Sequence, residues 1–127
     1  MNDNRRRRIL LIEDNSDTQL IFKIYLRELY DLEIADTAEA GIKLLKENEY
    51  DLLILDINLP GELDGSAVLN ELRNEMQKKD FPVLVVTAYA MKGDREKYLQ
   101  QGANDYLPKP VIKDVFMDKI RYFTDVA

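Results

Sequence analysis

The stretch DLLILD, residues 51–56, is a short apolar run with an aspartate at each end. Two further runs follow the same pattern, ILLI at 9–12 and PVLVVT at 82–87. Short apolar runs between turn-forming residues are typical of strands buried on both faces of a parallel sheet. Weaker runs at 32–35 and 105–107 are candidates for two more strands.

The segments between these runs have the spacing and the start signals of helices. In the first, Leu20, Ile21, Ile24 and Tyr25 follow a capping residue at Asn15 or Ser16. Apolar residues three and four apart are typical of the buried face of a helix. The other predicted helices are 38–48 after Thr37, 65–77 after Asp64, a short helix from Asp94 that stops at Gly102, and a last helix marked by Val115, Phe116 and Ile120 that runs nearly to Ala127.

Strand and helix therefore alternate five times along the chain, with short connections. This order predicts an α/β fold, in which a doubly wound parallel sheet carries helices on both faces. For five strands the common order across such a sheet is 2-1-3-4-5. A chain of 127 residues is long enough for one domain and too short for a second.

Charge and composition exclude several classes of function. The chain has no Cys and no His, which excludes Cys nucleophiles, Ser-His-Asp triads and the usual zinc, copper and iron-sulfur sites. A net charge of −6 disfavours direct binding of nucleic acid. The apolar runs are far shorter than the roughly 20 residues that a membrane-spanning helix needs. We therefore expect a cytoplasmic protein that does not insert into membranes.

The compositional break of the sequence is its N-terminal arginine run, Arg5 to Arg8. Four charges ahead of the first predicted strand have no obvious apolar surface to cover, so we expect residues 1–8 to form a solvated basic tail. The globular domain is then expected to span 9–127.

Polar residues gather where the predicted strands end. In a parallel sheet these ends meet at one edge, and the ligand site is expected between strands 1 and 3. Any one of these residues is ordinary in a loop, but the fold brings all of them to one cleft. They are Glu13 and Asp14 after the first strand, Asp56 and Asn58 at the third, Thr87 at the fourth, and Lys109 with Pro110 after the fifth.

The residue types in this cluster indicate a particular chemistry. Asp14, Asp56 and Glu13 repel one another unless a cation neutralises them, and carboxylates with a main-chain carbonyl suit Mg²⁺ or Mn²⁺. Lys109 and the hydroxyl of Thr87 supply the charge and the donor that phosphoryl oxygens need. A carboxylate nucleophile with these neighbours predicts a site where an acyl phosphate forms.

The same residues carry a family resemblance over residues 9 to about 124. The stretches LIEDN, DLLILDINLPGELDG and VTAYAMKGDREKYLQQGANDYLPKP resemble the receiver domains of two-component response regulators, above all those attached to hybrid histidine kinases and some stand-alone receivers. The resemblance implies a flavodoxin-like fold with five helices. It also implies a phosphorylation-activated switch that catalyses only its own phosphorylation and dephosphorylation and is otherwise not an enzyme.

The resemblance also assigns roles to single residues. Asp56 becomes the phosphoacceptor, and Asp14, Asp56 and the main-chain carbonyl of Asn58 become Mg²⁺ ligands, with Glu13 acting through water. Thr87 and Lys109 would hold the phosphoryl oxygens, Tyr106 would be an aromatic that turns inward on phosphorylation, and the Lys109-Pro110 peptide would be cis. The partners implied are a histidine kinase or histidine phosphotransfer protein and a downstream protein target. We expect that target on a basic face with Lys92, Arg95, Lys97 and Tyr98.

Two positions depart from the expected pattern. The loop LPGELDG, residues 59–65, is one residue longer than expected, and Tyr89 stands where family members vary and where it is expected to slow attack by water on the phosphate. The sequence leaves open the cognate kinase, the target, the lifetime of the phosphate, the oligomeric state, and whether the receiver acts alone or belongs to a larger protein.

Three other functions fit this pattern of residues less well. A phosphatase of the haloacid-dehalogenase type also uses an Asp at a strand end, but it needs a second Asp two residues later, where this chain has Asn58, and it carries a cap domain. A flavodoxin needs a first loop that accepts phosphate, whereas Glu13 and Asp14 repel it. A purely structural module with this fold would not need a complete acidic pocket. A Walker A motif is absent from the sequence.

Overall fold

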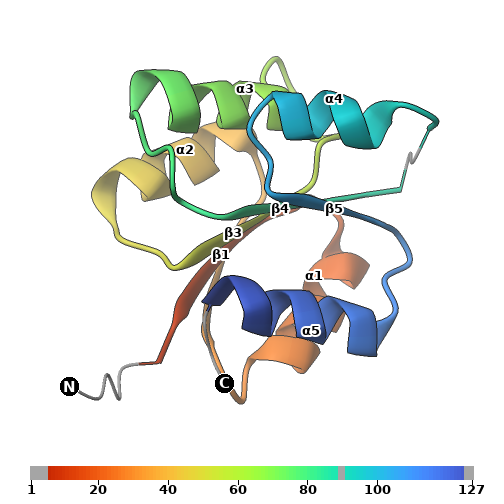
Figure 1. Ribbon diagram of the computed structural model, residues 1–127. Helices are drawn as coiled ribbons and strands as arrows, with labels where there is room; N and C mark the ends of the chain where they lie inside the picture. The colour runs from red at the N-terminus through yellow and green to blue at the C-terminus, as the bar shows by residue number, and fades with distance from the viewer. Residues whose placement is uncertain (1–5, 89–90, 125–127) are drawn as a thin grey trace.

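The computed structural model describes residues 6–88 and 91–124 and has three layers (Figure 1). A central sheet is covered on one face by α2, α3 and α4 and on the other by α1 and α5. All strand pairs are parallel, and their order is β2-β1-β3-β4-β5, which confirms the predicted topology. The strands are β1 Arg8–Ile12, β2 Asp31–Ala35, β3 Leu52–Leu55, β4 Val83–Thr87 and β5 Asp105–Pro108.

The helices begin where the sequence predicts. The side chains of Asn15, Thr37 and Asp64 each accept a hydrogen bond from a main-chain amide three residues later, so each of them caps a helix. Gly102, with φ +115°, follows the fourth helix. The helices are α1 Ser16–Leu26, α2 Ala38–Glu47, α3 Gly65–Asn70, α4 Asp94–Gln100 and α5 Lys113–Thr124.

The third helix differs from the uninterrupted helix predicted over 65–77. After α3 the chain makes a π-helical turn, η1 Glu71–Glu75, in which the amide of Met76 bonds to the carbonyl of Glu71 at 2.7 Å. Gln77, with φ +55°, then turns the chain away. A π turn widens the helix locally and redirects the side chains within it. In this helix it carries Arg73 into a buried position.

Apolar residues form one core on each side of the sheet. Alternate strand residues point to opposite faces, so β1, β3, β4 and β5 each bury side chains in both cores. The half-exposed β2 adds Ala35 to one core and packs Leu32 and Ile34 against the other. The core below the sheet centres on Phe22 of α1 and Phe116 of α5, whose rings stack at 4.6 Å. The core beneath α2, α3 and α4 includes Leu53, Leu55 and Val85.

The buried face of α1 is not the one that the sequence predicts. Phe22 and Leu26 are buried, whereas Leu20, Ile21 and Ile24 are 56%, 45% and 49% exposed. Apolar residues occur on both sides of this helix, and its stacking partner on α5 determines which side faces the core. The residues that the spacing placed inside therefore form an apolar patch on the surface.

The arginine run does not form a tail over its described residues. Arg8 is the first residue of β1, and the guanidinium of Arg6 donates to the carbonyls of Arg27 and Tyr30 at 2.6 and 2.7 Å and pairs with Asp31 at 3.1 Å. These carbonyls lie just past the end of α1, where acceptors lack partners within the helix. The expected solvated tail is therefore wrong for Arg6 to Arg8, since Arg7 and Arg8 also donate to main-chain carbonyls, those of Thr124 and Glu49. Arg5 lies outside the described residues.

Replacing Arg6 with alanine is expected to lower the free energy of unfolding by about 1 kcal/mol, because two helix-end carbonyls lose a charged donor. Chemical denaturation measures this difference. Arg121→Ala is the control, because its ion pair with Asp118 is solvent-exposed and makes little contribution. Equal stability of Arg6→Ala and wild type would show that the contacts of Arg6 do not hold this end of the fold.

No helix in the described part of the chain is long and apolar enough to cross a lipid bilayer.

Candidate functional site

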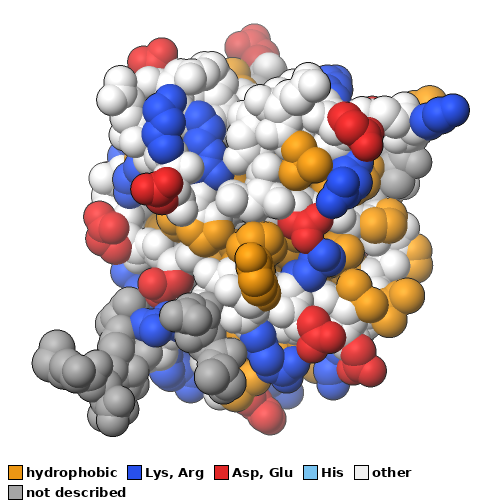
Figure 2. Space-filling model, viewed as in Figure 1, with side chains coloured by type: hydrophobic (Ala, Val, Ile, Leu, Met, Phe, Trp, Pro, Cys, Tyr) orange, Lys and Arg blue, Asp and Glu red, His pale blue; other side chains and the backbone are white. Residues whose placement is uncertain are grey.

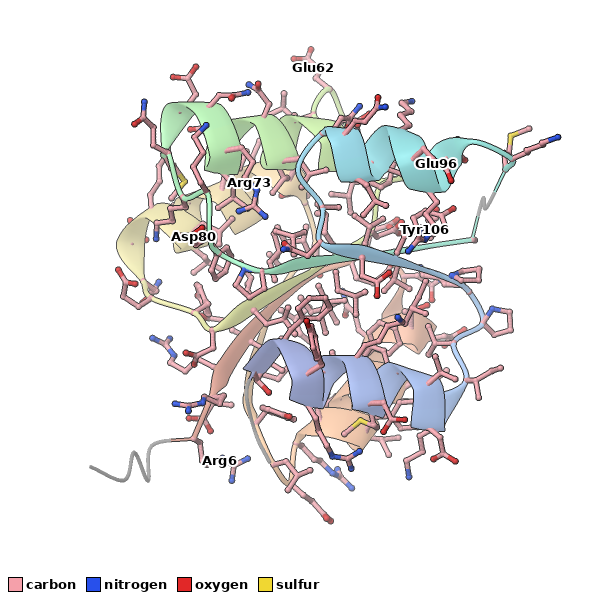
Figure 3. The ribbon with its side chains drawn as sticks, viewed as in Figure 1. Arg6, Glu62, Arg73, Asp80, Glu96 and Tyr106 are labelled. Carbon is pink, nitrogen blue, oxygen red and sulfur yellow. The ribbon has the colours of Figure 1, made fainter. Side chains whose placement is uncertain are left out.

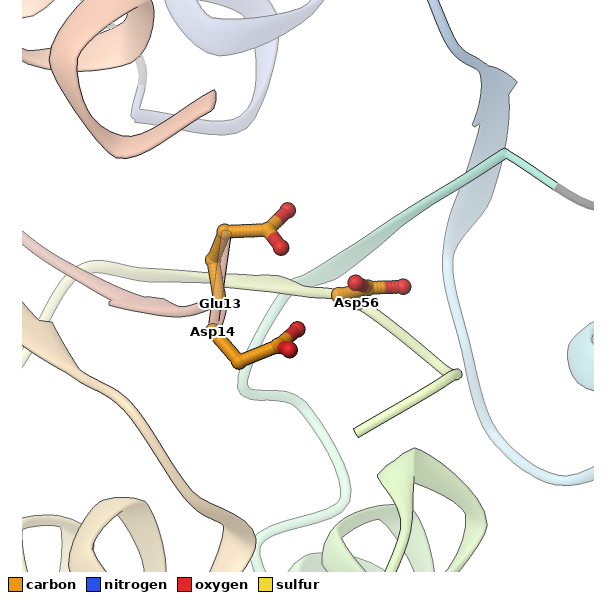
Figure 4. A group of neighbouring side chains, drawn as sticks. All are labelled: Glu13, Asp14 and Asp56. Carbon is orange, nitrogen blue, oxygen red and sulfur yellow. The ribbon is translucent and has the colours of Figure 1, made fainter. Parts of the chain in front are cut away.

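The candidate site lies at the edge of the sheet where β1 and β3 end. Ile12 is paired with Leu55, so the residues that follow them, Glu13 and Asp56, lie side by side. One carboxylate oxygen from each of Glu13, Asp14 and Asp56 lies within 4.8 Å of the other two (Figure 4). Glu13 and Asp56 are buried, and Asp14 is exposed. The predicted acidic cluster is therefore present, with one carboxylate open to solvent.

Lys109 brings a positive charge to this cluster from the end of β5. Its Nζ lies 2.5 Å from Oε1 of Glu13 and 3.4 Å from Oδ2 of Asp56. Its main-chain amide donates to the carbonyl of Thr87 at 2.8 Å, which ties the ends of β4 and β5 together. The peptide between Lys109 and Pro110 is cis, as the family resemblance implied.

Burial changes the acidity of Glu13. Removal from water raises its pKa to about 7, Lys109 opposes this rise, and the neighbouring Asp56 adds to it. The amide of Asn15 also donates to Oε2 of Glu13 at 3.1 Å, which favours the ionised form. Glu13 is therefore protonated over part of the range near neutrality until further positive charge reaches the cluster.

Asn58 links the acidic cluster to Thr87. The main-chain amide of Asn58 donates to Oδ1 of Asp56 at 3.1 Å, and its side-chain amide donates to Oγ1 of Thr87 at 2.8 Å. The sequence predicted a role for the carbonyl of Asn58 and missed this side-chain contact. For a loop residue just after a strand, such as Asn58, no sequence signal shows where the side chain points.

Two further residues shape the site. Gln19 on α1 donates to the main-chain oxygen of Glu13 at 2.5 Å and to Oδ1 of Asp36 at 2.7 Å, and nothing in the sequence marks it. Gly65 begins α3, and a Cβ there would lie 2.8 Å from the carbonyl oxygen of Asp56. Only glycine lets α3 approach the loop this closely, so close packing explains the glycine of the Asp64-Gly65 pair.

Tyr106 is buried in this structure, so its ring already points inward. It stacks on Tyr98 of α4, with ring centroids 6.1 Å apart and planes at 16°, and its hydroxyl has no hydrogen-bond partner within the described chain. Tyr98 is buried as well, so it does not belong to the exposed basic face that the sequence predicts. On that face, Lys92 and Arg95 are exposed, and Arg95 pairs with Asp105 at 3.6 Å. Tyr89 lies outside the described residues.

Comparisons with known proteins agree on one class of protein for this fold and this acidic cluster. The response regulator receiver domain family matches residues 9–121. The match covers most of the chain, and the chain belongs to this family of two-component signalling domains.

Individual relatives support the same class. The chain is 37% identical over 114 residues to the cell cycle response regulator CtrA of Brucella ovis, which covers 89% of this chain and 48% of that protein. The chain thus spans about half the length of the curated relatives it matches. A CheY-like receiver domain protein from Methanospirillum hungatei has a TM-score of 0.86 and 29% identity, over 95% of each chain.

One solved relative bears on the metal. The receiver domain of the sensor histidine kinase PA1611 from Pseudomonas aeruginosa has a TM-score of 0.85 and 31% identity, over 95% of this chain and 99% of that one, and it holds a magnesium ion in its active-site cleft. The all-oxygen donor set of Glu13, Asp14 and Asp56 fits such an ion. No comparison supports a phosphatase of the haloacid-dehalogenase type.

The raised pKa of Glu13 predicts a pH dependence in metal-free protein. The pKa of Glu13 is 4.5 in the unfolded state and about 7 in the folded state. Between these two pH values the folded state binds the proton more tightly. The free energy of unfolding is therefore expected to fall as pH rises through this window, by on the order of 1 to 3 kcal/mol. Denaturation in EDTA from pH 4.5 to 8 measures it. Glu13→Gln does not titrate, so it should lose this slope, and an unchanged slope in that variant would contradict the assignment.

Proposed function

We propose that this receiver domain takes a phosphoryl group on Asp56 from a phosphohistidine in a kinase or phosphotransfer protein. The observation that carries this proposal is the position of Asp56 at the strand-end edge of the sheet, where its carboxylate lies within 4.8 Å of oxygens of Glu13 and Asp14 and 3.4 Å from Nζ of Lys109. An oxygen of Asp56 forms the new bond to phosphorus while the phosphorus–nitrogen bond of the donor breaks. The bonding electrons leave with the imidazole nitrogen.

A divalent cation fits the carboxylates of Glu13, Asp14 and Asp56, with the carbonyl of Asn58 as a further ligand implied by the family. When bound, magnesium would offset the negative charge that gathers on the phosphoryl oxygens. Manganese has the same ligand preference and is expected to substitute for it.

The other residues of the site would hold the phosphoryl group after transfer. The ammonium group of Lys109 lies close enough to Asp56 to donate to a phosphoryl oxygen, and Thr87 presents its hydroxyl from the neighbouring strand. Asn58 now donates to that hydroxyl oxygen. A phosphoryl group would offer Thr87 a stronger acceptor, which would draw the hydroxyl toward Asp56.

Signalling would follow from a shift between two states of α4 and β5. Tyr106 already lies inward against Tyr98, so phosphorylation would stabilise this arrangement and not create it. Coupling of this kind is typically about 1 to 3 kcal/mol. The target would then bind the face of α4, β5 and α5 that carries Lys92 and Arg95. On this proposal the domain acts on its own Asp56 and on no separate substrate.

The phosphoryl donor would dock beside the site on the apolar patch of α1. Ile21 lines an apolar hollow that also includes Lys109 and Pro110, and Leu20 and Ile24 extend exposed apolar surface along the helix. A partner on this patch would shield Asp56 from water and cover side chains that the fold leaves exposed. It would also leave the face of α4, β5 and α5 free for a target.

Intact-mass measurement after incubation with a small acyl phosphate and Mg²⁺ tests the proposal. We expect one added phosphoryl group, and peptide mapping should place it on Asp56. A phosphatase would instead release free phosphate from phosphate monoesters in repeated turnovers. Steady release of phosphate without a phosphorylated form of the protein would contradict the receiver function and indicate a phosphatase.

A further inference from the structure

Arg73 is a buried cation that forms no ion pair with any residue the structure describes. In the described part of the chain the buried charged side chains are Glu13, Asp56 and Arg73, and the first two share Lys109. Arg73 is 8% exposed, and no carboxylate of the described residues lies within 4.0 Å of its nitrogens; Asp80 favours its charge only from farther away. A buried charge without a counter-charge is costly, so the surroundings of Arg73 favour an anion.

The position of Arg73 is fixed by neutral oxygens. Its guanidinium donates twice to the carbonyl of Gly102, at 3.0 and 2.7 Å, once to the carbonyl of Lys78 at 2.5 Å, and once to Oδ1 of Asn104 at 3.0 Å. A Cβ at Gly102 would lie 2.7 Å from Cγ of Arg73, so the glycine makes room for this side chain. These bonds hold the guanidinium in place, and none of their acceptors carries a charge.

This side chain lines a polar groove between α3 with η1 on one side and the turn from α4 to β5 on the other. The groove has a volume of about 620 Å³, and its charged lining residues are Arg73 and Lys79. Its other lining residues are neutral, mostly amides such as Asn70 and Gln101, and no carboxylate is among them. In a chain of net charge −6, this is a local concentration of positive charge and hydrogen-bond donors.

The groove lies at the end of the sheet away from the acidic cluster. Arg73 extends from the helix toward the space between α3 and the segment that follows α4 (Figure 3). From the same side, white and blue atoms cover most of this region of the surface, with a red carboxylate at its margin (Figure 2). Gly102 and Asn104 lie before the start of β5, so the groove is at the opposite end of the sheet from Asp56.

We propose that this groove binds a small sugar phosphate. Arg73 and Lys79 supply the charge that recognises the phosphate group, and the amide side chains supply donors and acceptors for hydroxyl groups. Gln101 lines the groove, and its Oε1 is buried without a hydrogen-bond partner in the described chain, so a rotation of this side chain toward a sugar hydroxyl would give that oxygen a partner. The volume lies within the range of about 300 to 1,000 Å³ that small-molecule sites occupy.

Amide NMR with ribose 5-phosphate as the probe tests this proposal. The titration is done in EDTA, so that the acidic cluster repels the probe and Asp56 takes no part. We expect saturable shift changes at the amides of Gln101 and Gly102, none with ribose, and weaker binding of inorganic phosphate alone. Absence of saturable changes overturns the proposal, and so does inorganic phosphate binding as tightly as ribose 5-phosphate, because the sugar then contributes nothing.

Neighbouring lysines provide matched variants. Lys79→Gln removes a charge that lines the groove, and we expect it to weaken binding about fivefold or more. Lys78→Gln is the control, because its Nζ lies 6.0 Å above the ring of Phe81 and its side chain does not line the groove. Equal weakening by both variants would show a diffuse charge effect and overturn the proposal. Asp56→Asn should bind the probe as wild type does, which separates this test from that of the proposed phosphorylation.

Discussion

Asp56→Asn is expected to reduce phosphorylation by a small acyl phosphate at least about 100-fold, because the amide that replaces the carboxylate cannot form an acyl phosphate by the same attack. The substitution keeps the shape of the side chain. It removes one negative charge from beside Glu13 and Lys109, so the protein is expected to fold and to become more stable in the absence of metal. Intact-mass measurement and thermal unfolding on the same sample give both results.

Asp118→Asn is the matched control for this experiment. It makes the same chemical change on α5, where the carboxylate of Asp118 is 80% exposed and lies outside the acidic cluster. Its labelling should equal that of wild type. Labelling that persists in Asp56→Asn would move the phosphoacceptor to another residue.

Removal of divalent cations is the second change with a large expected effect. In EDTA, the carboxylates of Glu13, Asp14 and Asp56 face an incoming phosphoryl anion, and among the described residues Lys109 is the cation that pairs with this cluster. Phosphorylation is expected to fall about 100-fold or more, and added Mg²⁺ should restore it. Rates measured over a series of Mg²⁺ concentrations give the apparent affinity of the site for the ion.

Asp14→Asn and Asp36→Asn form a pair of variants for the metal experiment. Asp14 contributes an oxygen to the cluster, whereas Asp36 binds Gln19 outside it. Asp14→Asn should need a higher Mg²⁺ concentration for the same rate, and Asp36→Asn should not. If wild-type labelling in EDTA equalled labelling in Mg²⁺, the acidic cluster would have no role in binding a metal.

The sheet and its edge could be predicted because both depend on short-range signals. Buried parallel strands are continuous apolar runs, and the residues after them must meet at one edge whatever the details of packing. For this reason Glu13, Asp56 and Lys109 were found from the sequence, and the structure brings them together. Helix starts were found for a similar reason, since a capping side chain bonds to the amide three residues later.

Contacts between distant segments could not be predicted. The burial of Phe22 in place of Ile21 depends on Phe116, which lies far along the chain. The contacts of Arg6 depend on carbonyls past the end of α1, and the buried position of Arg73 depends on a π turn that has no sequence signal. In each case the deciding partner lies outside the window that a local pattern covers.

The bond between Nε of Arg7 and the carbonyl of Thr124, at 3.2 Å, has a use in protein engineering. It brings the two ends of the described chain together at one edge of the molecule (Figure 1). A short flexible linker could therefore join the ends, and the ring could be reopened at Gly61, where the chain is exposed and a side chain would meet nothing within 4 Å. Such a circular permutant would place its new termini in the loop after Asp56, so that a fluorescent reporter fused there would lie next to the acidic cluster.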